Sequence, residues 1–118
     1  MAENDRRDLP PTSDRRPQRR TRVLLGGIIA FFDGAEHFDC TIRDLTNAGA
    51  RVARPRNQPI PSMVYLVNMR DRTAHEAKVA WSNGKEVGLS FIKSFALHEI
   101  ADPNLAYLKR LWHERAMR

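Results

Sequence analysis

Apolar and polar positions alternate in short runs through the middle of the chain, and each run ends at turn residues. Alternation with a period of two is typical of a strand with one buried face, and Gly, Asn, Asp and Pro between such runs are typical of hairpin connections. We therefore expect six short strands, within residues 23–32, 37–45, 50–55, 63–69, 73–81 and 86–92. Strands at this spacing predict a mainly β fold, either a small antiparallel barrel or a sandwich.

The strand patterns also predict which side chains share a face and where the chain turns. One face of the second predicted strand carries Phe38, Cys40, Ile42 and Asp44, and one face of the fifth carries Ala77, Val79 and Trp81. We expect Trp81 and Trp112 to pack in the core or against a helix rather than to form stacking platforms. The Gly26–Gly27 pair predicts a bulge or a sharp bend within the first strand. Turns are expected at Asp33–Gly34, Thr46–Gly49 and Ser82–Gly84.

The last part of the chain predicts one amphipathic helix. Asp102 followed by Pro103 is a typical helix start, with an N-cap acceptor and then proline at the first helical position. Leu105, Leu108 and Trp112 follow at spacings of three and four, which is typical of a single apolar face. We expect this helix to pack on the β domain, where it covers an open end of the barrel, or to face a partner.

The positive charge of the chain is concentrated in arginine. The 118 residues carry a formal net charge of +6, and sixteen of the twenty basic residues are arginine. A guanidinium is planar and binds phosphate or a guanine edge through two hydrogen bonds, so this composition indicates an anionic partner such as a nucleotide. Residues 1–14 combine charges with two prolines and almost no apolar side chains, and we expect them to form a disordered tail.

The composition also narrows the compartment and the class of protein. One cysteine, Cys40, allows no intrachain disulfide, and no apolar run is long enough to span a bilayer, so we expect a cytoplasmic protein without membrane insertion. His37 and Cys40 would point to opposite faces of a strand and cannot easily share a metal. No Ser-His-Asp or Cys-His pairing and no phosphate-binding glycine loop is evident. We therefore expect no catalytic residue, no metal and no enzyme.

The segment "DLTNAG" contains a candidate binding cup. Asp44 and Thr46 lie two residues apart and share a face of the strand, and Gly49 occupies a position that requires either a positive φ or a close backbone approach. A carboxylate and a hydroxyl beside open backbone can accept hydrogen bonds from the ring N–H and amino group of guanine. The alternative is an ordinary hairpin turn in which Asp44 and Thr46 bond their own backbone.

The segment "RRPQRRTR", residues 15–22, is a candidate anion-binding arm. Pro17 favours an extended conformation at Arg16, and in extended chain residues four apart share a side and span roughly 13 Å. Two arginines at that spacing can reach separate groups of one large anionic ligand. The candidate pairs are Arg16 with Arg20 and Arg15 with Arg19. The alternative is a solvated basic tail.

Taken together, the two segments resemble the PilZ domain, the bacterial receptor for cyclic di-GMP. That family is marked by an R-x-x-x-R motif in an N-terminal loop and a D/N-x-S-x-x-G motif on the barrel. Both arginine pairs match the first motif, and Asp44, Thr46 and Gly49 match the second, with threonine where serine is usual. The resemblance covers residues 15–92 and includes "VAWSNGKEVGLSF", the family-like last hairpin.

The resemblance implies a six-stranded antiparallel β-barrel at residues 23–92, followed by a linker and helix at residues 93–118. It implies that Arg15, Arg16, Arg19 and Arg20 bind cyclic di-GMP together with Asp44, Thr46 and Gly49. The ligand would change the exposed surface and signal to a partner protein. Two alternatives stay open: a basic barrel that binds single-stranded RNA or DNA, and a PilZ-like adaptor that does not bind the nucleotide. Against the first, only 8% of residues are aromatic and none are spaced for base stacking along a strand.

Overall fold

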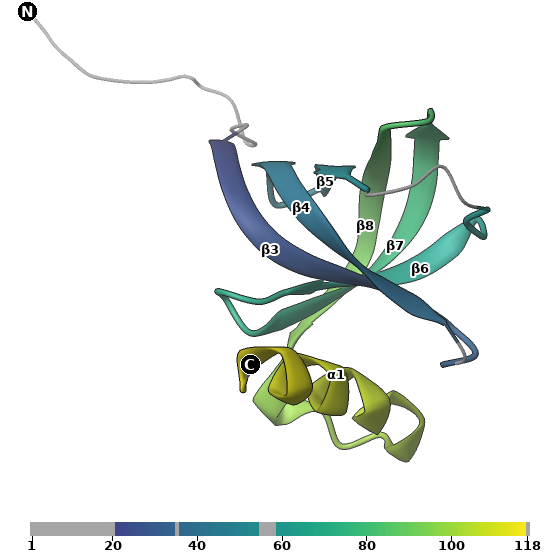
Figure 1. Cartoon of the computed structure of the whole chain (residues 1–118). Helices are drawn as coiled ribbons and strands as arrows, with labels where there is room; N and C mark the ends of the chain where they lie inside the picture. Colours follow the sequence, from purple (N-terminus) through teal and green to yellow (C-terminus); the bar gives the residue numbers. More distant parts are fainter. Residues whose placement is uncertain (1–20, 35, 55–58, 118) are drawn as a thin grey trace, which may run out of the picture.

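The computed structural model describes residues 21–34, 36–54 and 59–117. Six strands are present: β3 (Thr21–Phe31), β4 (His37–Leu45), β5 (Gly49–Ala53), β6 (Met63–Asn68), β7 (Thr73–Ser82) and β8 (Glu86–Ala96). Two 3-10 turns, η1 (Leu97–Glu99) and η2 (Pro103–Leu105), lead into the helix α1 (Ala106–Ala116). The expected mainly β fold with one C-terminal helix is therefore confirmed (Figure 1).

The six strands close into an antiparallel barrel. Their order around the barrel is β3-β4-β5-β8-β7-β6, and β3 also pairs with β6. Closure leaves no unpaired edge among these strands, which removes a common route to aggregation. The barrel predicted from the hairpin spacing is thus confirmed, and the sandwich alternative is excluded.

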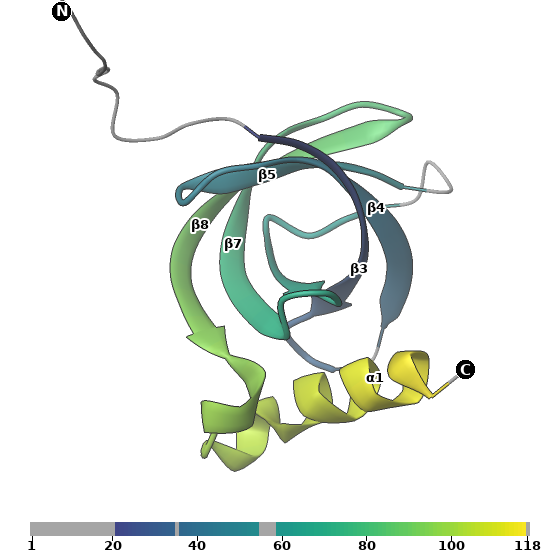
Figure 2. The same ribbon diagram turned by 90° about the vertical axis from the view of Figure 1, so that its left-hand side faces the viewer.

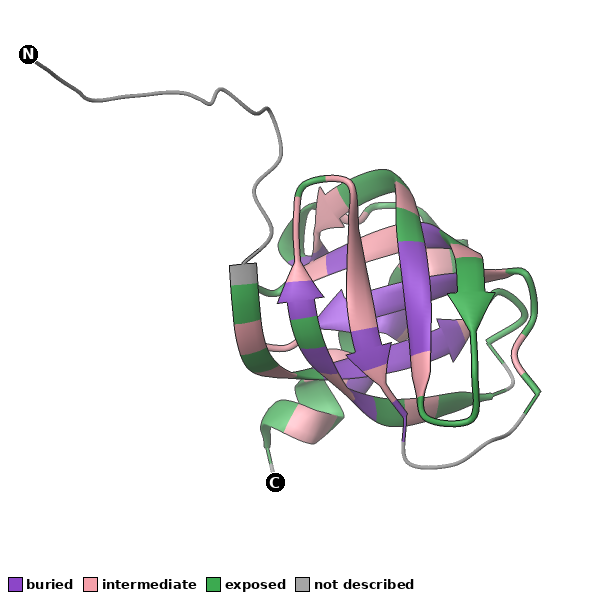
Figure 3. Ribbon diagram, turned by 90° about the horizontal axis from the view of Figure 1, so that it is seen from above, coloured by how far each residue is buried: buried purple, intermediate pink, exposed green. Residues whose placement is uncertain are grey.

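Two hydrophobic clusters share the strands β3 and β6. The barrel interior holds Ile29 of β3 and Leu66 of β6, whereas Ile28 and Val67 point outward and pack with the helix; all four are fully buried. Because successive side chains of a strand point to opposite faces, burial on both faces explains why residues 28–30 of β3 are all apolar. Figure 3 shows buried and exposed positions alternating along strands of the barrel.

Helix α1 lies outside the ring of strands and covers its wall, as Figure 2 shows. The expectation that it covers an open end of the barrel is wrong, because the outward side chains of β3 and β6 supply the apolar surface. Three polar contacts fix the helix there. The Tyr107 hydroxyl donates to the carbonyl of Phe31 at 2.9 Å, Trp112 Nε1 donates to the carbonyl of Met69 at 2.9 Å, and Arg115 Nε donates to the Asp39 carboxylate at 2.6 Å.

The predicted helix start is correct in position, but the first turn is not α-helical. The Asp102 carboxylate accepts a hydrogen bond from the backbone N–H of Asn104 at 2.9 Å, and Pro103 begins η2 rather than α1. None of the described helices is long and apolar enough to cross a bilayer.

Four register shifts interrupt the strand pairings, and they occur between residues 22 and 25, 42 and 44, 76 and 77, and 79 and 81. The bulge expected at Gly26–Gly27 is not at that position, since both glycines pair in regular register with Thr41 and Cys40. The irregularity of β3 lies just before them. The other shifts matter more, because each bulge changes the face on which the following side chains lie.

Candidate functional site

A row of four side-chain positions crosses four adjacent strands of the barrel. Asp44 of β4 lies opposite Arg51 of β5, Arg51 lies opposite Gly88 of β8, and Gly88 lies opposite Trp81 of β7. The neighbouring Val52 and Val87 belong to the barrel core, so the row faces outward. Residues from distant parts of the sequence are therefore brought to one outer patch.

Asp44 reaches this patch because of the bulge that precedes it. Ile42 and Leu45 both face the barrel interior, and the register shift between Ile42 and Asp44 places two residues on β4 opposite one on β5. Without the shift, alternation would keep Asp44 on the inner face with Ile42, as the sequence pattern suggests. The observed register instead places the carboxylate beside Arg51.

Asp44 and Arg51 form an ion pair in which the carboxylate is buried and the guanidinium is partly exposed. Arg51 Nε donates to the Asp44 carboxylate at 2.5 Å, and Asp44 is only 3% exposed. Arg51 also pairs with the Glu86 carboxylate. The hydrogen bond to Asp44 is the main cause that raises the pKa of Arg51, with smaller contributions from the charges of Asp44 and Glu86, against desolvation. The patch thus holds a fixed arrangement of charges.

Thr46 uses its hydroxyl to build the turn between β4 and β5. The oxygen accepts hydrogen bonds from the backbone N–H groups of Ala48 and Gly49, both at 3.0 Å, and the hydroxyl lies 3.3 Å from the carbonyl oxygen of Gly49. The backbone N–H of Thr46 donates to the same carbonyl at 2.9 Å. In this structure the alternative of a self-bonded hairpin turn holds for Thr46.

Gly49 is required at its position by a close backbone approach rather than by a positive φ. A Cβ added there would lie 2.2 Å from the carbonyl oxygen of Leu89 on β8. No side chain fits that space. The turn at Thr46 therefore brings β5 directly against β8.

Trp81, like Asp44, lies on a different face from the one that the sequence pattern predicts. It was expected in the core or against the helix, but its side chain is on the outer face and 44% exposed. The register shift between Val79 and Trp81 moves it off the inner face that Val79 occupies. Its indole lies over Gly88, where an added Cβ would come within 2.1 Å of Nε1. By contrast, Trp112 packs on the barrel through α1 as expected.

These residues surround one pocket of about 260 Å³, lined in part by Asp44, Thr46, Gly49, Trp81 and Ser90. It combines a carboxylate, backbone groups at a turn and an exposed aromatic face. Such a set suits a flat, nitrogen-rich ring that can donate hydrogen bonds and stack.

The predicted arginine arm joins the barrel beside this pocket. Arg15, Arg16, Arg19 and Arg20 lie outside the described residues, so their contacts stay a prediction. The first described residue, Thr21, pairs with Leu45, and Arg22 pairs with Asp44. The chain therefore enters the barrel next to the carboxylate of the pocket.

The described residues form no comparable group of side chains for metal binding or catalysis. They contain no group of three or more His, Cys, Asp or Glu side chains placed to hold a metal ion. Burial, with a smaller contribution from Asp39, raises the pKa of the Cys40 thiol to about 12. Burial lowers the pKa of His75 to about 4, and the His75 ring stacks on Phe91 with a centroid distance of 3.9 Å.

Comparison with protein-family models matches the PilZ domain over residues 14–110, which is most of the chain. The matched range includes the arginine segment from its first arginine, all six strands of the barrel, and the first half of α1. A search of curated proteins finds no match.

Proposed function

Because the chain belongs to the PilZ domain family, a family of cyclic di-GMP receptors, we propose that it binds cyclic di-GMP at the pocket around Asp44. The observation that carries the proposal is the register that gathers the family motif. Asp44, Thr46 and Gly49 border one pocket, and the arginine segment enters the barrel at Thr21, opposite Leu45.

Each part of the pocket has a task that fits one guanine. The Asp44 carboxylate accepts hydrogen bonds from the ring N–H and amino group of the base, and charge-assisted bonds of this kind are stronger than neutral ones. Arg51 balances the carboxylate charge while Asp44 is buried. Trp81 supplies an aromatic face for the ring, while Thr46 and Gly49 keep the turn against β8 so that the base is not blocked.

The phosphates require charge that the pocket itself does not offer. Arg51 is already bound to Asp44 and Glu86. We assign the phosphates and the outer guanine edges to the arginine segment, through Arg16 with Arg20 or Arg15 with Arg19. Arginine binds both groups through two parallel hydrogen bonds.

The signal in this proposal is a change of surface. Binding holds residues 15–20 over the pocket, so that a partner protein meets a different face of the barrel in the two states. The family is one of binding domains, and we propose the role of a receptor and adaptor without a catalytic step.

Calorimetric titration tests the proposal with cyclic di-GMP, GTP and a short single-stranded RNA. We expect micromolar or tighter binding of cyclic di-GMP alone. Arg16→Ala, Arg20→Ala and Asp44→Ala should each weaken it by about 10- to 100-fold, the equivalent of a charge-assisted hydrogen bond of about 1.5–3 kcal/mol. Arg70→Ala is the matched control, because Arg70 is exposed, lies in the β6–β7 turn and pairs with Asp71.

Three results would contradict this proposal. Tight RNA binding that ignores sequence and falls steeply with salt would favour the nucleic-acid alternative. Equal affinity of all three variants and the parent would show that the ligand binds elsewhere. If the protein binds no nucleotide, the result would favour the alternative of a PilZ-like adaptor that does not bind cyclic di-GMP.

A further inference from the structure

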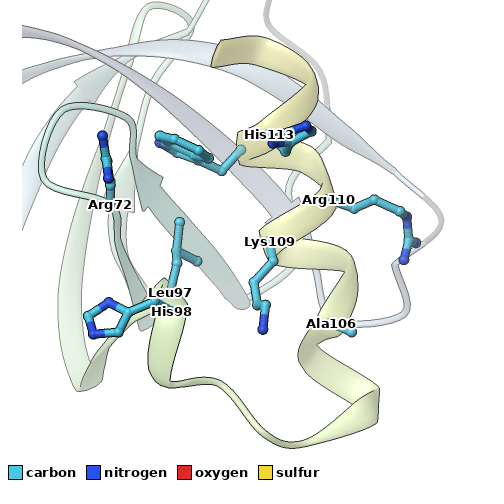
Figure 4. Close-up of a pocket in the computed structure, with 8 residues that line it drawn as sticks. Arg72, Leu97, His98, Ala106, Lys109, Arg110 and His113 are labelled. Carbon is cyan, nitrogen blue, oxygen red and sulfur yellow. The ribbon is translucent and has the colours of Figure 1, made fainter. Parts of the chain in front are cut away.

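A second hollow lies between α1, η1 and the turn that joins β6 to β7 (Figure 4). Its volume is about 570 Å³. We call it the basic groove; its lining includes Arg72, Leu97, Lys109, Arg110, Trp112 and His113. None of these residues borders the pocket at Asp44.

The basic groove has an apolar floor and a cationic rim. Leu97 is 4% exposed and Trp112 is half-buried, whereas Arg72, Lys109 and Arg110 are exposed. No Asp or Glu is among the described residues that line it. An occupant must therefore bring negative charge together with apolar surface.

Arg72 is held at the edge of the basic groove in a costly backbone conformation. Its φ is +55°, a region that residues other than glycine rarely adopt. The turn enforces this value, since the backbone N–H of Arg72 donates to the carbonyl of Asn68 at 3.0 Å and its carbonyl accepts from the N–H of Leu97 at 2.9 Å. Glycine would suit the position better, yet a long cation occupies it, with the guanidinium 5.1 Å from the centre of the Trp112 ring.

The cations do not converge on one point. In Figure 4 Arg72 stands across the hollow from α1, Lys109 extends from the helix beside Leu97, and Arg110 points away along the outer side. A compact anion such as a single phosphate would meet one of them at a time. A segment with several separated carboxylates can meet them together.

The same geometry disfavours two other anionic surfaces. A bilayer binds apolar side chains that protrude, whereas Leu97 is recessed at the floor. An RNA base would need an open aromatic face, and the Arg72 guanidinium already lies over the Trp112 ring. A protruding protein segment satisfies both the recessed floor and the dispersed rim.

We infer that the basic groove docks a segment of a partner protein in which carboxylates flank apolar side chains. This inference rests on the proposed function in one respect: docking is the step by which the receptor would pass on its signal. The groove itself is defined by contacts that do not involve the nucleotide pocket.

Fluorescence anisotropy tests the docking with two labelled probes. One is an eight-residue peptide of alternating glutamate and leucine, and the other has glutamine in place of glutamate. We expect the acidic peptide to bind at least about tenfold tighter, and Arg72→Gly and Lys109→Glu each to weaken it about tenfold or more, as for loss of a charge-assisted contact. Arg72→Gly keeps the fold, because glycine adopts the positive φ without strain.

Matched variants separate the basic groove from general positive charge. Arg70→Ala removes a neighbouring arginine of the same turn, and Lys78→Glu reverses an exposed lysine on β7; both should leave the affinity within about twofold, as expected for screened surface charge. The inference is overturned if the two peptides bind alike, or if these controls weaken binding as much as the groove variants. It is also overturned if anionic vesicles or RNA bind more tightly than the acidic peptide in a manner that Arg72→Gly abolishes.

A titration of Arg72→Gly with cyclic di-GMP keeps the two proposals apart. Unchanged nucleotide affinity with lost peptide affinity supports the basic groove as a separate site. If the parent protein binds the acidic peptide through Arg72 but no cyclic di-GMP, the proposed function fails and the docking inference stands.

Discussion

Replacing Gly49 with alanine tests whether the approach of β5 to β8 is as tight as the structure shows. The new Cβ would lie 2.2 Å from the carbonyl oxygen of Leu89, whereas ordinary contact begins at about 3.4 Å. The obstacle is backbone, and it is held in the ladder that pairs Gly49 with Ser90 and Ala50 with Leu89. The strands must therefore separate by about 1.2 Å, which strains the core by about 1–3 kcal/mol and weakens a ladder hydrogen bond by about 1 kcal/mol.

We expect Gly49→Ala to lower the free energy of unfolding by about 3 kcal/mol in urea titrations. At about 4–8 °C per kcal/mol for a domain of this size, the Tm should fall by about 12–24 °C. The pocket at Asp44 should also lose affinity for cyclic di-GMP, because Gly49 borders it.

Gly26→Ala is the control for glycine replacement in the same barrel. Its added Cβ would be 3.8 Å from Met69 Cγ, an ordinary contact, and its φ is not positive. Here the smaller entropy of the unfolded chain should raise stability by about 0.4–1 kcal/mol. The steric reasoning is refuted if Gly49→Ala unfolds within about 0.5 kcal/mol of the parent, or if the two variants lose equal stability.

Three further predictions concern single side chains. Gly88→Ala should push the exposed Trp81 indole aside rather than part the strands. We therefore expect a changed tryptophan emission spectrum, weaker cyclic di-GMP binding and less than about 1 kcal/mol of lost stability. An unchanged emission spectrum would contradict this prediction. Burial lowers the pKa of His75 from 6.5 to about 4, against the opposing effect of the Asp71 charge. The free energy of unfolding should therefore fall as the pH drops from about 6.5 to about 4. His75→Gln should remove this fall from the plot of unfolding free energy against pH. The Cys40 thiol, with its pKa raised to about 12, should not react with a disulfide reagent at pH 8 until urea unfolds the protein; rapid labelling of the native protein would show that the thiol is accessible.

The strands and their order along the chain were predictable because alternation and turn residues report local structure. The predicted strand at residues 37–45 has the observed bounds, and the turn at Ser82–Gly84 joins β7 to β8 as expected. The closed barrel followed from hairpin spacing and from the family resemblance. These features depend on neighbours in sequence, which a single sequence contains.

The faces of Asp44 and Trp81 were not predictable, because each follows a bulge. A bulge adds one residue to one strand of a pair and reverses the alternation beyond it, and it depends on the partner strand. The predicted position of the helix was wrong for a similar reason. The outward, buried side chains of Ile28 and Val67 form an apolar surface only when β3 and β6 lie side by side. The motif at Asp44, Thr46 and Gly49 was identified by family resemblance and not by its geometry.

Burial of β3 and β6 on both faces makes one wall of the barrel two layers thick and the opposite wall a single layer. On the single-layer side the outward residues of β4 and β8, such as Arg43 and Ser90, are exposed to solvent. Amide hydrogens of β6 and of residues 28–30 of β3 should therefore exchange only on global unfolding, while those of the thin wall exchange through local openings at lower free energy. The pocket lies on this thin wall, so the surface that would bind a ligand is also the part of the barrel that we expect to open locally at the lowest free energy.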